Sequence, residues 1–384
     1  MAAASSSATA PPAPMSAPRL VLHFDVNETI LVGDEAGGDT FEAALNKVIA
    51  KSVFVRAGPD GKAADRPLRA ADGTAVEGAA STPPMCLDHA GWPEGCVSYY
   101  RGVCRTAADK KAFTEPGNLG EQHRPALEEL ERALRWRGGA AGACPDPDPR
   151  LCHDGVHHLL LPAFFVTLAE LAQAGRAVSV VVRTFGSDTA AVLGAIRAFG
   201  EGAAVRCADG RQVPAVPELA GASGQWAGRY AADGSFSLRA PHGQPAALIE
   251  DEEAVVRLLE WGGASSREAA PRISVTAIQD DYDWWSGHGW APSAGKPLWV
   301  TESDESALHI FFDDNIHPLP DDSIVAVRSR PSPDEPFRAV GGAEALAMHG
   351  THLIRVPTAA PILDERWFLD RIGECEAKWR AQHA

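Results

Sequence analysis

The sequence predicts an α/β fold with a doubly wound parallel sheet. Apolar runs rich in β-branched residues alternate with amphipathic segments of helical length, and short joints connect them. Three of the apolar runs end in polar residues, at Asp25, Thr184 and Asp313. Because the carboxyl ends of parallel strands meet at one edge of a sheet, we expect these three side chains to share a crevice.

Composition narrows the class of protein. The chain has 384 residues, of which 45% are hydrophobic, so it can bury a large core. Its formal net charge of −16 disfavours binding to nucleic acid and to anionic membrane surfaces. No apolar run reaches the length of a membrane-spanning helix, and the seven cysteines form no CxxC pair. We therefore expect a cytoplasmic protein with reduced thiols.

The amino-terminal segment, residues 1–18, is almost entirely Ala, Ser, Thr and Pro. Such a composition cannot pack a core and predicts a disordered tail. A transit peptide that targets an organelle is the alternative, although the segment has no arginine before Arg19.

A large cap is expected after the first strand, which spans residues 20–25. Asp39 and Thr40 can cap a helix over 41–51. Gly, Pro and short polar runs then dominate residues 56–159, with one short amphipathic helix over 126–136. So long an irregular stretch within a compact domain predicts a lid or binding insertion, here a cap over the end of the first strand.

Regular structure resumes near residue 160. We expect helices over 162–174, 189–199, 251–261 and 364–382, and strands over 177–184, 272–278, 309–312, 323–327 and 352–356. The α/β core then comprises residues 19–55 and 160–384. A second Gly-rich segment, 208–250, predicts a smaller insertion within it.

Two further features point to phosphate chemistry. Lys296 stands alone over a long reach of chain, in a Gly-Lys-Pro turn ahead of the third strand. Asp313 and Asp314 are adjacent acids at a strand end, where a nearby cation would relieve their repulsion. Paired carboxylates, the Thr184 hydroxyl and a lone lysine suit Mg²⁺ with a phosphoryl group. The alternatives are ordinary turn residues at the strand ends and a solvated loop lysine.

Together these stretches resemble the four motifs of the haloacid dehalogenase superfamily of phosphotransferases. The segment Asp25-Val-Asn-Glu-Thr29 is similar to the first motif, Thr184 to the second, Lys296 to the third and Asp313-Asp314 to the fourth. The resemblance covers the core strands and adjoining loops, and both insertions fall where that superfamily places its caps. It implies a Rossmann-like core and a Mg²⁺-dependent hydrolase or phosphotransferase that acts on a small phosphorylated metabolite.

The resemblance also implies a role for each residue. Asp25 would attack the phosphoryl group and form an aspartyl-phosphate. Thr184 would hydrogen-bond the phosphoryl oxygens, and Lys296 would neutralise negative charge during transfer. The expected magnesium ligands are Asp25, the backbone carbonyl of Asn27, and Asp313 or Asp314.

One position departs from the pattern of the superfamily. Its phosphatases usually carry a second Asp two residues after the nucleophile, as general acid and base, and this chain has Asn27 there. An amide cannot exchange protons near neutral pH, so hydrolysis of alkyl phosphates would need Glu28, His23 or a cap residue as a substitute. A binding or regulatory protein without turnover is therefore one alternative. Carbon–halogen hydrolysis through Asp25 is another.

Further residues are candidates for substrate binding. Thr29 adds a hydroxyl just after the first strand, and Arg183 either reaches a phosphate or pairs with a core acid. Asp281 and Trp285 lie in a loop rich in acids and aromatics, which suits a polar ligand with an apolar face. The alternative is that the tryptophans of this loop only pack it onto the core.

Overall fold

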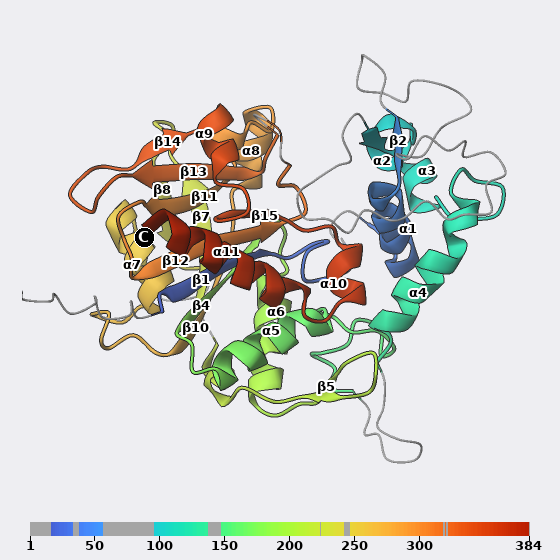
Figure 1. Cartoon of the computed structure of the whole chain (residues 1–384), viewed down its shortest axis with the longest axis horizontal. Helices are drawn as coiled ribbons and strands as arrows, with labels where there is room; N and C mark the ends of the chain where they lie inside the picture. Colours follow the sequence, from blue (N-terminus) through green and yellow to red (C-terminus); the bar gives the residue numbers. More distant parts are fainter. Residues whose placement is uncertain are drawn as a thin grey trace, which may run out of the picture.

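The computed structural model of the chain describes residues 17–33, 38–56, 96–136, 147–222, 224–241, 246–317, 319 and 322–383. Its centre is an eight-stranded sheet with the order β15-β12-β1-β4-β10-β7-β8-β9 (Figure 1). The strands from β15 to β7 are parallel to their neighbours, and β8 and β9 are antiparallel. This confirms the predicted α/β class and the mostly parallel sheet.

The strands of the central sheet are β1 (Arg19–Asp25), β4 (Val178–Thr184), β7 (Gly224–Tyr230), β8 (Phe236–Arg239), β9 (Leu248–Ile249), β10 (Ile273–Gln279), β12 (Ala307–Asp313) and β15 (Leu353–Arg355). The chain leaves β1 toward β4, β10 and β7 on one side, and later returns to place β12 and β15 on the other. The direction of winding thus reverses between β1 and β12. In open α/β sheets, ligands bind at the carboxyl ends of the strands beside such a reversal.

Alternate residues of β1 pack on opposite faces of the sheet. Leu20, Leu22 and Phe24 join the core under the helices α5 (Pro162–Gln173), α6 (Thr189–Gly200) and α11 (Trp367–His383). Val21 joins the core under α7 (Glu252–Trp261) and Trp299. Both faces of the central strands are therefore covered, which explains why they read as continuous apolar runs.

A second, smaller sheet covers part of the face on which α7 lies. Its order is β11-β13-β14, and the strands are β11 (Lys296–Thr301), β13 (Val325–Arg330) and β14 (Arg338–Val340). Leu298 and Val300 of β11 pack against Phe311 of β12. The short helices α8 (Tyr282–Gly287) and α9 (Gly342–Ala347) flank this sheet (Figure 1).

Two expectations about this part of the chain are corrected. Lys296 lies not in a turn but at the start of a buried strand, β11. The segment 208–250 forms no separate insertion in its described part, because β7, β8 and β9 extend the central sheet. Its first strand, β6 (Gln212–Val213), pairs with β5 (Val205–Arg206) in a short hairpin that contacts α5.

A helical lobe lies to one side of the central sheet (Figure 1). It contains α1 (Phe41–Ser52), α2 (Tyr99–Gly102), α3 (Ala107–Lys111), α4 (Arg124–Leu134) and the hairpin β2 (Phe54–Arg56) and β3 (Cys96–Ser98). Val48 and Ile49 of α1 share a core with Leu127 and Leu130 of α4, next to the core helix α10 (Ala359–Leu363). The helix expected over 41–51 thus packs with the proposed cap. Residues 1–16, 57–95 and 137–146, which include most of the predicted tail and part of the cap, lie outside the described residues.

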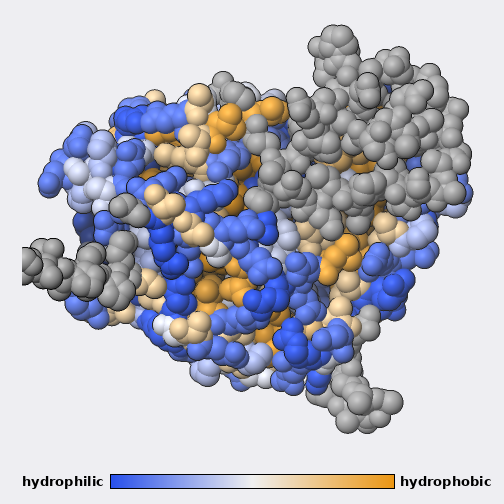
Figure 2. Space-filling view, in the orientation of Figure 1, coloured by the Kyte–Doolittle hydropathy of each residue, from blue (hydrophilic) through white to orange (hydrophobic). Residues whose placement is uncertain are grey.

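The described surface is mainly hydrophilic in the view of Figure 2. Figure 2 shows hydrophilic side chains over most of the described surface in this view, with smaller apolar patches between them. Within the described ranges, no helix is both long and apolar enough to cross a bilayer.

Burial of His123 in the helical lobe makes folding sensitive to pH. Burial lowers the pKa of His123 to about 4, from 6.5 in an exposed chain. Between these values the unfolded state binds one more proton, so the free energy of unfolding falls as the pH decreases through this range. We expect His123→Phe to reduce this slope by up to about 1.4 kcal/mol per pH unit. Denaturant unfolding between about pH 7 and pH 5 measures it, and an unchanged slope contradicts the prediction.

Candidate active site at the carboxyl edge of the sheet

The site is built on a buried lysine held between two aspartates. Asp25 ends β1 and Asp313 ends β12, the strands that flank the reversal of winding. Lys296, which is 1% exposed, reaches both from the second sheet. Its Nζ donates to Oδ1 of Asp25 at 2.5 Å and to Oδ2 of Asp313 at 2.8 Å. Lys296 is 271 positions from Asp25 and 17 positions from Asp313 in the sequence, yet the three side chains form one ion cluster.

In this cluster the charges of Lys296, Asp25 and Asp313 shift one another's pKa values. Burial by itself would lower the pKa of Lys296, but the carboxylates of Asp25 and Asp313 hold that pKa above its usual value. Burial, together with the charge of Asp313, raises the pKa of Asp25 well above its usual range, and Lys296 opposes this. The cluster therefore favours an additional positive charge, which would stabilise an ionised Asp25.

A second lysine, which sequence reasoning did not assign, joins the cluster from the helical lobe. Lys51 lies in the last turn of α1, and its Nζ donates to Oδ2 of Asp314 at 2.8 Å and to the carboxylate of Glu28. Glu28 has a φ of 62°, in the left-handed region that non-glycine residues seldom adopt. Burial raises the pKa of Glu28 against the opposing effect of Lys51.

The charges of the cluster fit a divalent cation. Asp25, Asp313 and Asp314 each place an oxygen within 4.8 Å of the other two. With Glu28 there are four carboxylates, and with the two paired lysines the formal charge is about −2 when all groups are ionised. Carboxylate oxygens are the ligands that Mg²⁺ prefers in proteins. The residues present therefore fit the metal that the sequence predicted.

Thr184 and Asn27 lie beside the cluster and share a partner, Asp188. The Thr184 hydroxyl accepts the backbone N–H of Gly186 at 2.9 Å and donates to Oδ2 of Asp188 at 3.4 Å. The Asn27 side-chain amide donates to the same Asp188 oxygen at 3.3 Å. A Cβ at Gly186 would lie 2.5 Å from this oxygen, so glycine makes room for the Asp188 carboxylate.

These side chains border one cavity of about 450 Å³. Its lining residues are Asp25, Asn27, Thr184, Phe185, Gly186, Tyr282, Trp285, Lys296, Asn315 and Ile324. Residues of the first three sequence motifs therefore line the same space. Asp313 and Asp314 of the fourth motif do not line it, but Asp313 is joined to it through its ion pair with Lys296. Trp285, a candidate for substrate binding, lies in its wall.

Three other candidates for substrate binding do not line the cavity. Thr29 is fully buried, and its hydroxyl accepts the backbone N–H of Asp314 at 3.2 Å. Arg183 is also fully buried and donates to Asp280 at 2.6 and 3.0 Å. Asp281 caps α8 by accepting the backbone N–H of Trp284. In this structure each of the three supports the site through a fixed structural contact.

A buried polar chain continues beneath the site. Arg183 contacts Nδ1 of His23 at 3.3 Å, and Nε2 of His23 lies 3.3 Å from His309. Nε2 of His309 lies 3.3 Å from Glu260. His23 is thus committed to this chain, as Glu28 is to Lys51. Neither lines the cavity, which disfavours both as substitutes for a general acid or base.

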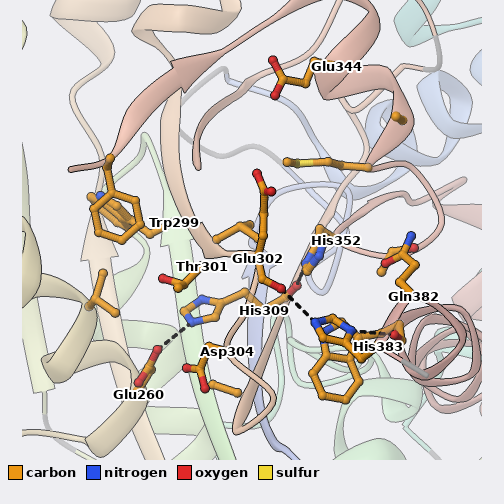
Figure 3. Close-up of a pocket in the computed structure, with 18 residues that line it drawn as sticks. Glu260, Trp299, Thr301, Glu302, Asp304, His309, Glu344, His352, Gln382 and His383 are labelled. Carbon is orange, nitrogen blue, oxygen red and sulfur yellow. Dashed lines mark hydrogen bonds and ion pairs between the residues drawn. The ribbon is translucent and has the colours of Figure 1, made fainter. Parts of the chain in front are cut away.

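A second cavity, of about 380 Å³, lies at the other end of β12 (Figure 3). Glu260 and His309 point toward each other there, and His383 reaches the backbone carbonyl of Glu302. The wall carries acids, histidines and tryptophans, but no three of the metal-ligating side chains converge as they do near Asp25. Because ligands of open α/β sheets bind at the carboxyl ends of strands, the cavity at Asp25 is the better candidate for an active site.

One more group of potential metal ligands is present among the described residues: Cys207, Asp209 and Glu365. Burial raises the pKa of the Cys207 thiol to about 12, and a metal binds the thiolate. Asp209 is exposed on the surface. None of these three residues lines the cavity at Asp25 or the cavity at Glu260. The group is therefore a less suitable metal site than the acid cluster around Asp25.

Comparisons with known proteins found no match for this chain. No protein-family model matches the chain, and neither the curated proteins nor the solved structures gave a match. The resemblance to the haloacid dehalogenase superfamily therefore rests on the residues and their arrangement.

Removing the buried lysine should destabilise the fold. Lys296→Met would leave Asp25 and Asp313 buried without their shared cation, and breaking a buried ion pair from one side costs about 3–5 kcal/mol. The exposed Lys378→Met is the matched control and should change the free energy of unfolding by less than about 0.5 kcal/mol. Denaturant unfolding of both variants measures the difference. Equal stability of the two would show that Lys296 is not an essential part of the cluster.

Proposed function

We propose that this protein is a Mg²⁺-dependent hydrolase or phosphotransferase that acts on a small phosphorylated substrate through Asp25. The observation that carries the proposal is the convergence of Asp25, Thr184, Lys296 and Asp313 at the carboxyl edge of the parallel sheet. A carboxylate beside a buried lysine, a hydroxyl and further acids can supply the nucleophile, the charge neutralisation and the metal ligands for phosphoryl transfer. The proposal also accounts for the resemblance to the haloacid dehalogenase superfamily.

The reaction would proceed in two displacements. An Asp25 carboxylate oxygen attacks phosphorus, the bond from phosphorus to the leaving oxygen breaks, and the leaving group departs with the bonding electrons and takes up a proton. Water then attacks the phosphorus of the acyl phosphate, which releases inorganic phosphate, restores the Asp25 carboxylate and gives up a proton. In a phosphotransferase an acceptor hydroxyl replaces this water. Each displacement is easier than the single uncatalysed step.

The surrounding residues supply charge and orientation. The Lys296 ammonium lies 2.5 Å from Asp25, where it would offset the negative charge that nucleophile and phosphate bring together. The Thr184 hydroxyl, which accepts the Gly186 N–H, would turn its one proton from Asp188 to a phosphoryl oxygen. Mg²⁺ would be held by Asp25, Asp313 or Asp314 and the backbone of Asn27, and it would screen the like charges of nucleophile and phosphate.

Asn27 favours one alternative, a protein that binds a phosphorylated ligand without turning it over. The amide donates to Asp188 and has no proton to exchange near neutral pH. Loss of general acid–base help costs about 10² to 10⁴ in rate. Substrates with good leaving groups, such as acyl phosphates, depend least on this help. They are therefore the substrates on which the wild type should be most active.

Turnover distinguishes these functions. We expect wild-type protein to release phosphate from acetyl phosphate only when Mg²⁺ is present, and Asp25→Ala to abolish the release. Chelation of Mg²⁺ followed by its restoration should remove and return the activity, because the cation offsets the charge of the acid cluster. Colorimetric phosphate detection measures this. Activity that persists in Asp25→Ala would contradict the proposed nucleophile.

The control variants use the contact between Asn27 and Asp188. Asn27→Asp by itself would place two carboxylates about 3.3 Å apart, so the exchange Asn27→Asp with Asp188→Asn keeps one amide and one carboxylate. If the wild type is silent and the exchanged protein turns over alkyl phosphates, the binding alternative holds. If both are silent toward every phosphate offered, the phosphoryl-transfer proposal fails.

A further inference from the structure

The candidate active-site cavity has two chemically different parts. Its floor is polar and contains Asp25, Asn27, Thr184, Lys296 and Asn315. One side, here called the aromatic wall, is formed by Phe185, Tyr282 and Trp285. The floor accounts for a phosphoryl group, and the wall is left without a role in phosphoryl transfer.

The rings of the aromatic wall are held in a defined arrangement. Phe185 and Trp285 stack with 4.9 Å between ring centroids and an interplanar angle of 8°. Tyr282 meets both rings edge-on, at 5.8 Å and 74° to Phe185 and at 6.3 Å and 71° to Trp285. Stacked and edge-to-face geometries are the favourable arrangements of aromatic pairs. The wall is therefore preformed, which lowers the entropic cost of binding against it.

The aromatic wall leaves apolar surface exposed, and it contains one hydrogen-bond donor without an acceptor in the described part of the chain. Tyr282, the first residue of α8, is 49% exposed although it borders the cavity. Among the described residues no acceptor pairs with the buried indole N–H of Trp285. Trp290, which is 59% exposed, does not line the cavity and offers a comparison.

The wall also lies next to the reacting groups. Lys296 Nζ is 5.1 Å from the Phe185 ring centroid and 2.5 Å from Asp25. A substrate whose phosphorus is in reach of Asp25 therefore places its leaving group near the wall. A flat ring at that point can stack or meet the wall edge-on, whereas a saturated group of similar size gains only burial.

We propose that the leaving group of the phosphorylated substrate carries a flat aromatic ring, which binds against Phe185, Tyr282 and Trp285. This inference rests on the proposed function for the position of the phosphoryl group. It assigns the wall to recognition of the leaving group and the floor to the chemistry. The preference for a ring arises from contacts made in the bound state, so it should appear in both binding and turnover.

The test compares benzoyl phosphate with cyclohexanecarbonyl phosphate. Both are acyl phosphates with a six-membered carbon ring, so their leaving groups and apolar areas are closely matched, and neither depends on a general acid. Wild-type kcat/KM should be about 2- to 12-fold higher for benzoyl phosphate, the factor that corresponds to an aromatic pair. A ratio of one or below overturns the proposal.

Variants locate the preference within the cavity. Tyr282→Leu and Trp285→Leu should each bring the ratio of the two kcat/KM values toward one, because each removes a ring from the wall. Trp290→Leu is the matched control, since it removes a nearby exposed tryptophan, and it should keep the wild-type ratio. A ratio that survives both wall variants would contradict the assignment to this wall.

A binding measurement separates this inference from the proposed function. Asp25→Asn, loaded with Mg²⁺, is titrated with benzylphosphonate and with cyclohexylmethylphosphonate in a calorimeter. Tighter binding of the aromatic ligand, about 2- to 12-fold, supports the ring preference even if the wild type shows no turnover. Turnover together with equal binding of the two phosphonates overturns the ring preference and leaves the proposed function in place.

Discussion

The arrangement of the molecule depends on the ion cluster around Lys296. The central sheet alone brings the Asp25 and Asp313 carboxylates to one edge, where burial and mutual repulsion oppose their ionisation. The second sheet lies beside this edge, and its strand β11 carries Lys296 into contact with Asp313. The helical lobe adds Lys51 from α1, which contacts Asp314. Two additional structural units thus complete a charge distribution that the parallel sheet begins. The remaining charge of about −2 is what makes a divalent cation the fitting complement.

Asn27, which cannot act as a general acid or base, contacts Asp188 in the loop that follows β4. Its amide and the Thr184 hydroxyl both donate to the Asp188 carboxylate, and Gly186 leaves space for that contact. Asp at position 27 would oppose this arrangement, since two carboxylates would then meet. Asn27 is therefore part of a consistent local structure and not an isolated replacement. The proposed chemistry would have to work with an amide at this position, which favours substrates that need little proton transfer to the leaving group.

Much of the fold could be predicted, because the central strands are buried on both faces and read as unbroken apolar runs. β11 escaped prediction since Pro297 signals a turn, yet β11 is an edge strand, where the missing N–H of proline is tolerated. Asp25, Thr184 and Asp313 were found because strand ends are visible in the sequence. Lys51 was not, because its partner Asp314 is 263 positions away and nothing in α1 distinguishes it from an ordinary helix-terminal lysine.

The central claim is that Asp25 accepts the phosphoryl group, and direct trapping tests it most closely. Wild-type protein is incubated with acetyl phosphate and Mg²⁺, quenched, and treated with borohydride, which reduces an acyl phosphate to an alcohol. Mass spectrometry of the digested protein then locates the change. The account predicts that residue 25 becomes homoserine, only in samples that received both acetyl phosphate and Mg²⁺. Reduction at Asp313, Asp314 or Asp188 in place of Asp25 would contradict it, as would phosphate release without any reducible acyl phosphate.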